Sequence, residues 1–205
     1  MKLSLTIIVL YFSLQALHAQ TPAKEGLLFD EKGDIISQQV FEQKAKTGNY
    51  TWIFKESKDS ISARLLLKEE YETITANDRE KITEALQEIT GKPISENQTI
   101  IINFYQKENP TPNQKPCIDH YTSDRVYKNF IHRNKQYFQA FVTTKDFIYG
   151  KDFVHEDKHD IIRKLLFKYT SDCGNYIVIK PDGKFYRYTG EYRQDKIPAK
   201  LKENW

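Results

Sequence analysis

The sequence predicts a single α/β (α+β) fold, built on a sheet that helices cover. The first observation is an alternation of strand-like and helix-like segments that begins near Thr99, as in parallel β-α-β connections. The second is a strand–turn–strand pattern around Asp182-Gly183, which predicts an antiparallel hairpin. The third is a length of 205 residues with 39% hydrophobic residues, which suffices for one core but is short for two full domains.

Composition excludes several classes of protein. The hydrophobic content, together with 13% aromatic residues, excludes a disordered or fibrous chain. A formal net charge of +3 is too small to indicate a nucleic-acid-binding protein. Two cysteines cannot form a disulfide-rich scaffold or a four-cysteine zinc site. They allow one bridge or one reactive pair.

The N-terminus has the pattern of a secretory signal peptide. Lys2 gives a basic start, residues 3–14 are almost wholly apolar, and Ala19 provides a small residue before polar sequence. The apolar run is shorter than the roughly 20 residues that span a bilayer. We therefore expect residues 1–19 to be removed and the mature protein to be exported to the periplasm or the exterior, with no membrane span. A disulfide bond can persist in those compartments.

Residues 20–98 are expected to form an N-terminal extension that packs on the same core. A capping box predicts its clearest helix, because Asn77 is followed three residues later by Glu80. Gly91 and Pro93 would stop that helix. The apolar face of the helix comprises Ile82, Ala85, Leu86 and Ile89. The other elements predicted here are a hairpin over 27–36 and strands at 50–55 and 60–68.

Residues 99–205 are expected to form the main domain. The run at 99–105 is continuously apolar, which suits a strand buried on both faces. A polar segment with three prolines follows at 106–116 and predicts a loop. The remaining predictions are a helix from Ser123 with Val126, Tyr127, Phe130 and Ile131 inward, a strand at 136–142, a helix at 157–169, strands at 176–179 and 184–188, and a last helix at 195–203.

The second half of the chain resembles the thioredoxin-like fold of secreted redoxins. Residues 176–191, YIVIKPDGKFYRYTGE, resemble the C-terminal hairpin of that family, and residues 100–105 resemble the strand that leads into its active-site loop. The resemblance covers roughly residues 99–205. It implies a thioredoxin-like three-layer sandwich, to which the N-terminal α+β extension is added.

The chain departs from the family at the residues that carry its chemistry. The expected Cys-x-x-Cys motif reads Cys117-Ile118-Asp119-His120, so His replaces the second cysteine. Gly174, preceded by Cys173, stands where the family has a cis-proline. Dithiol exchange by an adjacent Cys-x-x-Cys pair is therefore unavailable to this chain.

The resemblance places Cys117 and Cys173 on neighbouring loops, which leaves three alternatives. The first is a structural disulfide, which an exported protein favours and which closes a long loop. The second is a redox pair in which Cys117 attacks, with its pKa lowered by a helix N-terminus and His120, and Cys173 resolves. The third is two unlinked thiols.

We therefore expect an exported thioredoxin-like protein that has lost dithiol redox chemistry and acts as a binding or structural protein. Its expected partner is another exported protein, with no cofactor and no nucleic acid. The alternative is an atypical thiol-disulfide oxidoreductase that uses Cys117, Cys173 and His120. Fold alone does not decide between these functions.

Two further motifs have functional and structural interpretations. His155, Glu156 and His159 match the H-E-x-x-H pattern of zinc hydrolases, which places both histidines on one helical turn. The charged residues between them instead favour a solvated first turn of the helix at 157–169. A zinc hydrolase is therefore the third alternative after the two functions above, and no metal ligand is assigned. Residues 184–193, KFYRYTGEYR, alternate bases with aromatics as nucleic-acid platforms do, but also suit a strand with one face in the core and one in water.

Overall fold

A computed structural model describes residues 25–107, 116–171 and 173–205. The predicted signal peptide at 1–19 lies outside the described residues, and so does most of the proline-rich loop, at 108–115. In the part of the chain that is described, no helix has the length and apolar character needed to cross a membrane.

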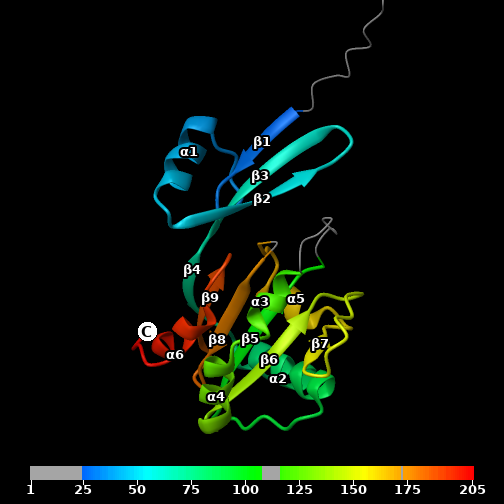
Figure 1. The fold of residues 1–205 in the computed structure, drawn as a ribbon. Helices are drawn as coiled ribbons and strands as arrows, with labels where there is room; N and C mark the ends of the chain where they lie inside the picture. Colours follow the sequence, from blue (N-terminus) through cyan, green and yellow to red (C-terminus); the bar gives the residue numbers. More distant parts are fainter. Residues whose placement is uncertain (1–24, 108–115, 172) are drawn as a thin grey trace, which may run out of the picture.

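The larger of two sheets has six strands in the order β4-β9-β8-β5-β6-β7 (Figure 1). Strands β5, β6 and β7 run parallel, whereas β8 and β9 form the predicted hairpin and β4 adds to β9, all antiparallel. The strands are β4 (Glu69–Thr73), β5 (Thr99–Tyr105), β6 (Tyr137–Thr143), β7 (Val154–Glu156), β8 (Asn175–Ile179) and β9 (Lys184–Thr189). The predicted mixed α+β architecture is confirmed.

Helices cover both faces of this sheet and give three layers (Figure 1). On one face, α2 (Ala76–Thr90) and α5 (Ile161–Leu166) enclose a cluster with the inward side chains of β5, β6 and β8. This cluster consists mainly of aliphatic residues with some phenylalanines, and we call its side of the sheet the aliphatic face. On the other face lie α3 (Cys117–Tyr121), α4 (Arg125–Arg133), the 3-10 helix η1 (Gln194–Lys196) and α6 (Ile197–Lys200), over a cluster rich in tyrosine. The buried run at β5 contributes to both clusters, as a strand with two covered faces should.

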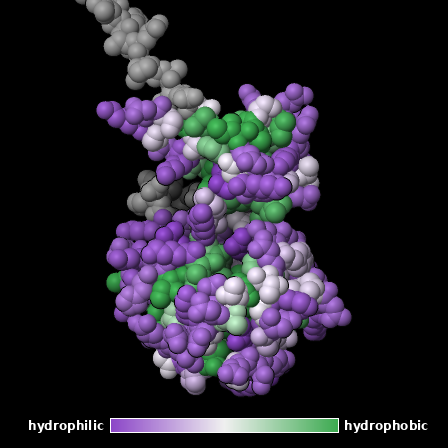
Figure 2. Space-filling model, turned by 180° about the vertical axis from the view of Figure 1, so that it is seen from behind, coloured by the Kyte–Doolittle hydropathy of each residue, from purple (hydrophilic) through white to green (hydrophobic). Residues whose placement is uncertain are grey.

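A smaller unit comprises a three-stranded sheet, in the order β1-β3-β2, and helix α1. Its elements are β1 (Glu25–Phe29), α1 (Gln38–Lys46), β2 (Tyr50–Glu56) and β3 (Ser60–Leu67). The ring of Phe41 on α1 lies 6.5 Å from that of Trp52 on β2. Seen from behind, hydrophobic residues gather on the surface of this unit (Figure 2). Its exposed large apolar side chains are Ile35, Val40, Trp52, Phe54 and Ile61.

The two units are joined where β3 passes into β4 through Lys68 alone. The guanidinium of Arg64 on β3 lies 4.1 Å from the ring centre of Tyr169 in the larger unit, and its Nη2 donates to the Glu31 carbonyl. The described part of residues 20–98, which were expected to form one N-terminal extension, thus belongs partly to each unit. Strand β4 and helix α2 belong to the larger sheet, and residues 25–67 form the smaller one.

The hairpin predicted over 27–36 is reduced to a single antiparallel bridge, in which the Asp30 N–H donates to the Asp34 carbonyl and the Ile36 N–H to the Leu28 carbonyl. Strand β1 instead pairs in parallel with β3, and only an isolated bridge joins Phe29 to Ile35. The turn is held by Asp30, whose Oδ1 accepts the backbone N–H groups of Lys32, Gly33 and Asp34 at 2.9–3.0 Å. A carboxylate that captures three successive amides stabilises a tight turn without a second strand.

Helix α2 begins earlier than predicted, because Thr75 and not Asn77 is its N-cap. Thr75 has extended backbone angles, and its Oγ1 accepts the Asp78 N–H at 3.0 Å. The predicted stop is confirmed at Gly91, which has a φ of 66° in the left-handed region.

The helix predicted at 157–169 is shorter and starts later, at Ile161. The buried Asp157 carboxylate accepts the N–H groups of Ile161 and Arg163, and so ends the preceding segment and holds the first turn. The last helix is also shorter than predicted, over Ile197–Lys200. On α4, Tyr127 is fully buried as expected, but Val126 is 74% exposed.

Candidate functional site

Cys117 and Cys173 form a disulfide bond with their Cα atoms 5.7 Å apart. Cys117 is the first residue of α3, and Cys173 lies in the loop before β8. The prediction that these cysteines occupy neighbouring loops is confirmed, and the alternative of two unlinked thiols is wrong. The bond spans a sequence separation of 56 and ties helix α3 to the sheet.

The two sulfur-bearing residues differ in exposure. Cys117 is buried, with 7% of its surface exposed, whereas Cys173 is partly exposed and lines a groove. The hydroxyl oxygen of Tyr121 lies 4.0 Å from Cys173 Sγ. Any reagent that approaches from the groove therefore meets Cys173 first.

Gly174 is required by the close approach of two loops. Its φ is +80°, and a Cβ there would lie 2.5 Å from the Gly190 carbonyl oxygen and 2.8 Å from the Tyr121 hydroxyl. The Gly190 N–H donates to the Gly174 carbonyl at 2.7 Å. Glycine at position 174 thus lets the segment after β9 lie directly against the disulfide loop.

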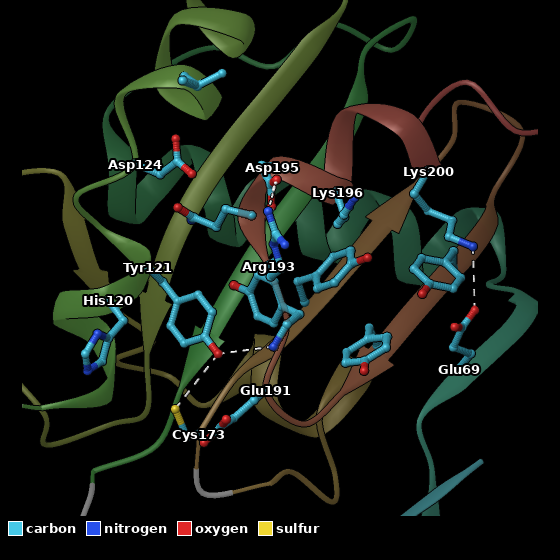
Figure 3. A pocket seen from close by; sticks show the side chains of 16 residues that line it. Glu69, His120, Tyr121, Asp124, Cys173, Glu191, Arg193, Asp195, Lys196 and Lys200 are labelled. Carbon is cyan, nitrogen blue, oxygen red and sulfur yellow. Dashed lines mark hydrogen bonds and ion pairs between the residues drawn. The ribbon is translucent and has the colours of Figure 1, made fainter. Parts of the chain in front are cut away.

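A groove of about 1170 Å³ runs from Cys173 across strands β8 and β9 to Lys200 (Figure 3). Five tyrosines line it: Tyr121 from α3, Tyr176 from β8, Tyr186 and Tyr188 from β9, and Tyr192 from the following loop. Figure 3 shows Cys173, Tyr121 and Glu191 at one end, with Lys200 and Glu69 at the other. One groove therefore extends from the disulfide to the edge of the sheet formed by β4.

The tyrosine rings pack on one another in sequence. Ring centres are 4.4 Å apart for Tyr121 and Tyr192, 4.6 Å for Tyr192 and Tyr176, and 5.8 Å for Tyr176 and Tyr188. Such separations are those of favourable aromatic pairs. The rings are thereby fixed, so the groove presents a preorganised surface of apolar faces and hydroxyl groups.

A buried polar network holds the floor of the groove. Asn103, in the middle of β5, donates to the Tyr192 hydroxyl at 2.5 Å and accepts from Gln139 Nε2 at 2.9 Å. Burial raises the pKa of Tyr176 to about 12 and raises that of Tyr192 further. These hydroxyls therefore remain protonated at neutral pH and act as donors as well as acceptors.

Charges of both signs stand on the rim of the groove. Arg193 and Asp195 form an exposed ion pair at 2.6 Å. Lys200 lies 2.9 Å from Glu203 and 3.5 Å from Glu69. Burial acts to lower the pKa of Lys200, but its contacts with Glu203, Tyr71 and Glu69 raise it overall. The rim carries no large excess of one charge.

His120, the third predicted site residue, lies at the edge of the groove (Figure 3). Its side chain is exposed, and its imidazole forms no hydrogen bond or ion pair with any residue the structure describes. Its neighbour Asp119 is the anchored residue, since it accepts a hydrogen bond from the Tyr149 hydroxyl and lies 3.5 Å from Lys151 Nζ. These contacts hold α3, and with it Cys117, from the solvent side.

The H-E-x-x-H residues do not share a helix. His155 and Glu156 lie on strand β7, and His159 lies in the turn that follows. Glu156 accepts the Asp146 N–H, and His159 pairs with Glu88 at 3.2 Å. Burial and the charge of Lys92 lower the pKa of His155. The helical premise of the zinc motif is therefore wrong, and the described residues contain no cluster of three potential metal ligands.

Sequence reasoning did not identify the groove. The segment at 184–193 was expected to have one face in water, but on β9 both Phe185 on the aliphatic side and Tyr186 on the groove side are buried, and Tyr188 is only partly exposed. The alternation of Tyr186, Tyr188 and Tyr192 was the available signal. It pointed to one aromatic face, but the tyrosines from α3 and β8 join that face only through the tertiary fold.

About half of the chain is similar to solved structures of two thioredoxin-like proteins. One is the pneumococcal exposed lipoprotein thioredoxin Etrx1 of Streptococcus pneumoniae, with 14% identity and a TM-score of 0.38 over 53% of this chain and 87% of that one. Another is a DsbF homologue from Corynebacterium diphtheriae, with 8% identity and a TM-score of 0.36 over 51% of this chain and 71% of that one. No protein-family model and no curated protein sequence matches the chain.

Proposed function

We propose that the protein is an exported binding protein in which the Cys117–Cys173 bond is structural and the tyrosine-lined groove holds a segment of another exported protein. The observation that carries this proposal is the groove itself. Its rings are fixed by mutual packing, its hydroxyls are neutral, and it is far larger than a single buried water would need. Tyrosine-rich concave surfaces of this kind suit recognition of polypeptide.

Loss of dithiol chemistry is supported by the surroundings of the cysteines. Cys117 is buried, and the residue three positions after it is an exposed histidine in place of a second cysteine. A structural bond is expected to have a reduction potential below about −300 mV. Equilibration of the purified protein with thiol redox buffers measures this potential. A value near those of thioredoxin or the oxidising Dsb proteins, above about −270 mV, would contradict the structural role.

Binding is tested with an array of short immobilised peptides and the purified, fluorescently labelled mature chain. Tyr188→Ala removes a partly exposed groove ring and is expected to abolish or strongly reduce the signal. Tyr169→Ala is the matched control, because Tyr169 is also partly exposed but stacks on Arg64 outside the groove. Equal loss in both variants, or no signal with the parent chain, would contradict the groove as the binding site.

Export is part of the same proposal. Cleavage after Ala19 predicts a mature N-terminus at Gln20. N-terminal sequencing of the protein recovered outside the cytoplasm checks it, and retention of residues 1–19 on cytoplasmic protein would contradict export.

A thiol-disulfide oxidoreductase is the second candidate, and the exposure of Cys173 is what favours it. A substrate thiolate would attack Cys173 Sγ, the Cys117–Cys173 bond would break, and Cys117 would leave as a thiolate. A second substrate thiol would then displace Cys173, so that a dithiol is oxidised as the protein disulfide is reduced. The reverse direction gives the test: the Cys173 thiolate of Cys117→Ser attacks a substrate disulfide and releases one substrate thiolate, and the mixed disulfide persists because Cys117 is absent to resolve it. Cys173→Ser should trap none.

A further inference from the structure

One polar side chain in the groove has no partner for its amide. Gln194 is 5% exposed and lines the groove, yet neither its Oε1 nor its Nε2 has a hydrogen-bond partner within residues 25–107, 116–171 and 173–205. A buried amide group that lacks both kinds of bond destabilises a protein by about 1–3 kcal/mol. Buried polar atoms are rarely left in this state, so the amide of Gln194 points to a bound group.

The chemistry of the amide limits what that group can be. A glutamine amide presents a carbonyl acceptor beside an N–H donor. Its complement is a donor beside an acceptor, which is how one residue of an extended peptide presents its own N–H and C=O to the same side. Such a peptide cannot simply add to the sheet here, because β8 lies between β5 and β9, and β9 lies between β8 and β4. Recognition of its backbone must therefore come from side chains.

We propose that Gln194 is the recognition residue of the groove, where its side-chain amide pairs with the backbone N–H and C=O of one residue in an extended peptide. This inference rests on the proposed function and names the chemistry of its ligand. Tyr176, Tyr188 and Tyr192 line the same groove and supply rigid apolar contact area. A rim with charges of both signs suits a polypeptide better than a polyanion.

Because the amide is covered, a ligand has to displace neighbouring groups to reach it. Both amide atoms of Gln194 are covered in the free protein. The residues on either side, Arg193 and Asp195, form an exposed ion pair at the mouth of the groove (Figure 3). An exposed pair contributes no more than about 1 kcal/mol, so a ligand can displace it readily.

The test uses the peptide array and, for the peptides that bind, fluorescence polarisation with soluble copies. Gln194→Leu keeps the volume but removes the amide, and is expected to weaken peptide binding by about tenfold. Gln136→Leu, at an exposed glutamine outside the groove, is expected to change nothing. The fold should survive Gln194→Leu, since replacing an unpaired buried amide by an apolar group is neutral or stabilising, and thermal unfolding checks this.

Backbone methylation of the peptide identifies the pairing directly. Methylation of one peptide nitrogen removes its donor, so at a single position it should weaken binding to the parent chain but not to Gln194→Leu. If Gln194→Leu binds every peptide as tightly as the parent chain does, the role of Gln194 is overturned while the groove stands. If glycans bind in a Gln194-dependent way and peptides do not, the peptide class is overturned. If neither binds, the proposed function itself fails.

Discussion

The two faces of the six-stranded sheet differ in the side chains that they bury. Towards α2 and α5, the sheet presents Ile100, Ile102 and Phe104 from β5, and the cluster contains isoleucine, leucine, valine, alanine and phenylalanine alone. Towards α3, α4 and α6, the neighbouring residues of the same strand are Ile101, Asn103 and Tyr105. One strand therefore contributes to a purely apolar cluster on one side and to a polar aromatic one on the other.

This difference indicates where stability and function reside. Among the described residues, the cluster on the aliphatic face contains neither tyrosine nor cysteine, and its apolar packing stabilises the fold. The tyrosine face holds the disulfide and a hydrogen-bonded network around Asn103. It also holds Tyr127 and Gln194, whose polar side-chain atoms have no hydrogen-bond partner in the described parts of the chain. Natural proteins accept such polar groups in a core chiefly where the groups specify a site.

The largest effect is expected from a truncation on the aliphatic face. Phe104 is fully buried, and its ring stacks on that of Phe167 at 4.5 Å. Phe104→Ala should lower the free energy of unfolding by about 3–5 kcal/mol, because it removes apolar contacts and leaves a cavity. Urea denaturation measures this change. Ile148→Ala, at an 82% exposed position, is the control and should shift stability by less than about 0.5 kcal/mol.

Removal of the disulfide, which lies on the tyrosine face, should have the next largest effect on the free energy of unfolding. The Cys117→Ser, Cys173→Ser double variant frees a loop with a sequence separation of 56, which chain entropy values at about 4 kcal/mol. Urea denaturation under non-reducing conditions should show this loss. Reductant should bring the parent chain to the same stability and leave the variant unchanged. Equal stability of both chains without reductant would contradict a structural bond.

Alkaline pH should destabilise the tyrosine face selectively. Burial raises the pKa of Tyr176 to about 12, against 10.0 for the free side chain, so the unfolded chain loses this proton first. The free energy of unfolding is then constant below about pH 10 and falls by about 1.4 kcal/mol per pH unit between about 10 and 12 for this residue. Denaturation at several pH values measures the slope. Tyr176→Phe should reduce it, and an unchanged slope would contradict the assignment.

The smallest expected effects are stability changes of opposite sign at two tyrosines on the same face. The buried hydroxyl of Tyr127 has no hydrogen-bond partner among the described residues, whereas that of Tyr192 bonds to Asn103 and Tyr105. Tyr127→Phe should therefore raise the free energy of unfolding by up to about 1 kcal/mol, and Tyr192→Phe should lower it by about as much. Calorimetry of the two variants checks the signs. A loss of stability in both would show that Tyr127 also has a partner.

Local patterns predicted the elements that depend on neighbouring residues. The apolar run at 99–105 and the turn at Asp182-Gly183 are properties of a few adjacent side chains, and both are found where the sequence placed them. Helix α5 was predicted to begin too early because the Asp157 carboxylate takes the N–H groups of Ile161 and Arg163. Apolar spacing contains no information on such a competing bond.

The candidate site is formed by residues that are far apart in the sequence, so local patterns could predict only part of it. The pairing of Cys117 with Cys173 was anticipated through the resemblance, since the family brings those loops together. The groove was not, because Tyr121, Tyr176 and Tyr192 belong to segments with unrelated patterns. Gln194 stands just before the predicted last helix and has no local feature that distinguishes a buried amide from a solvated one.

The position of the Cys117–Cys173 bond also determines how the protein should respond to a protease. The bond joins both ends of the stretch from 118 to 172, which contains α4, β6, β7 and α5. A single cut anywhere in that stretch therefore leaves two fragments that remain covalently attached. They should migrate as one species of full mass on a non-reducing gel and separate only after reduction. In a compartment that contains secreted proteases, the molecule can thus be nicked without losing either half of its sheet.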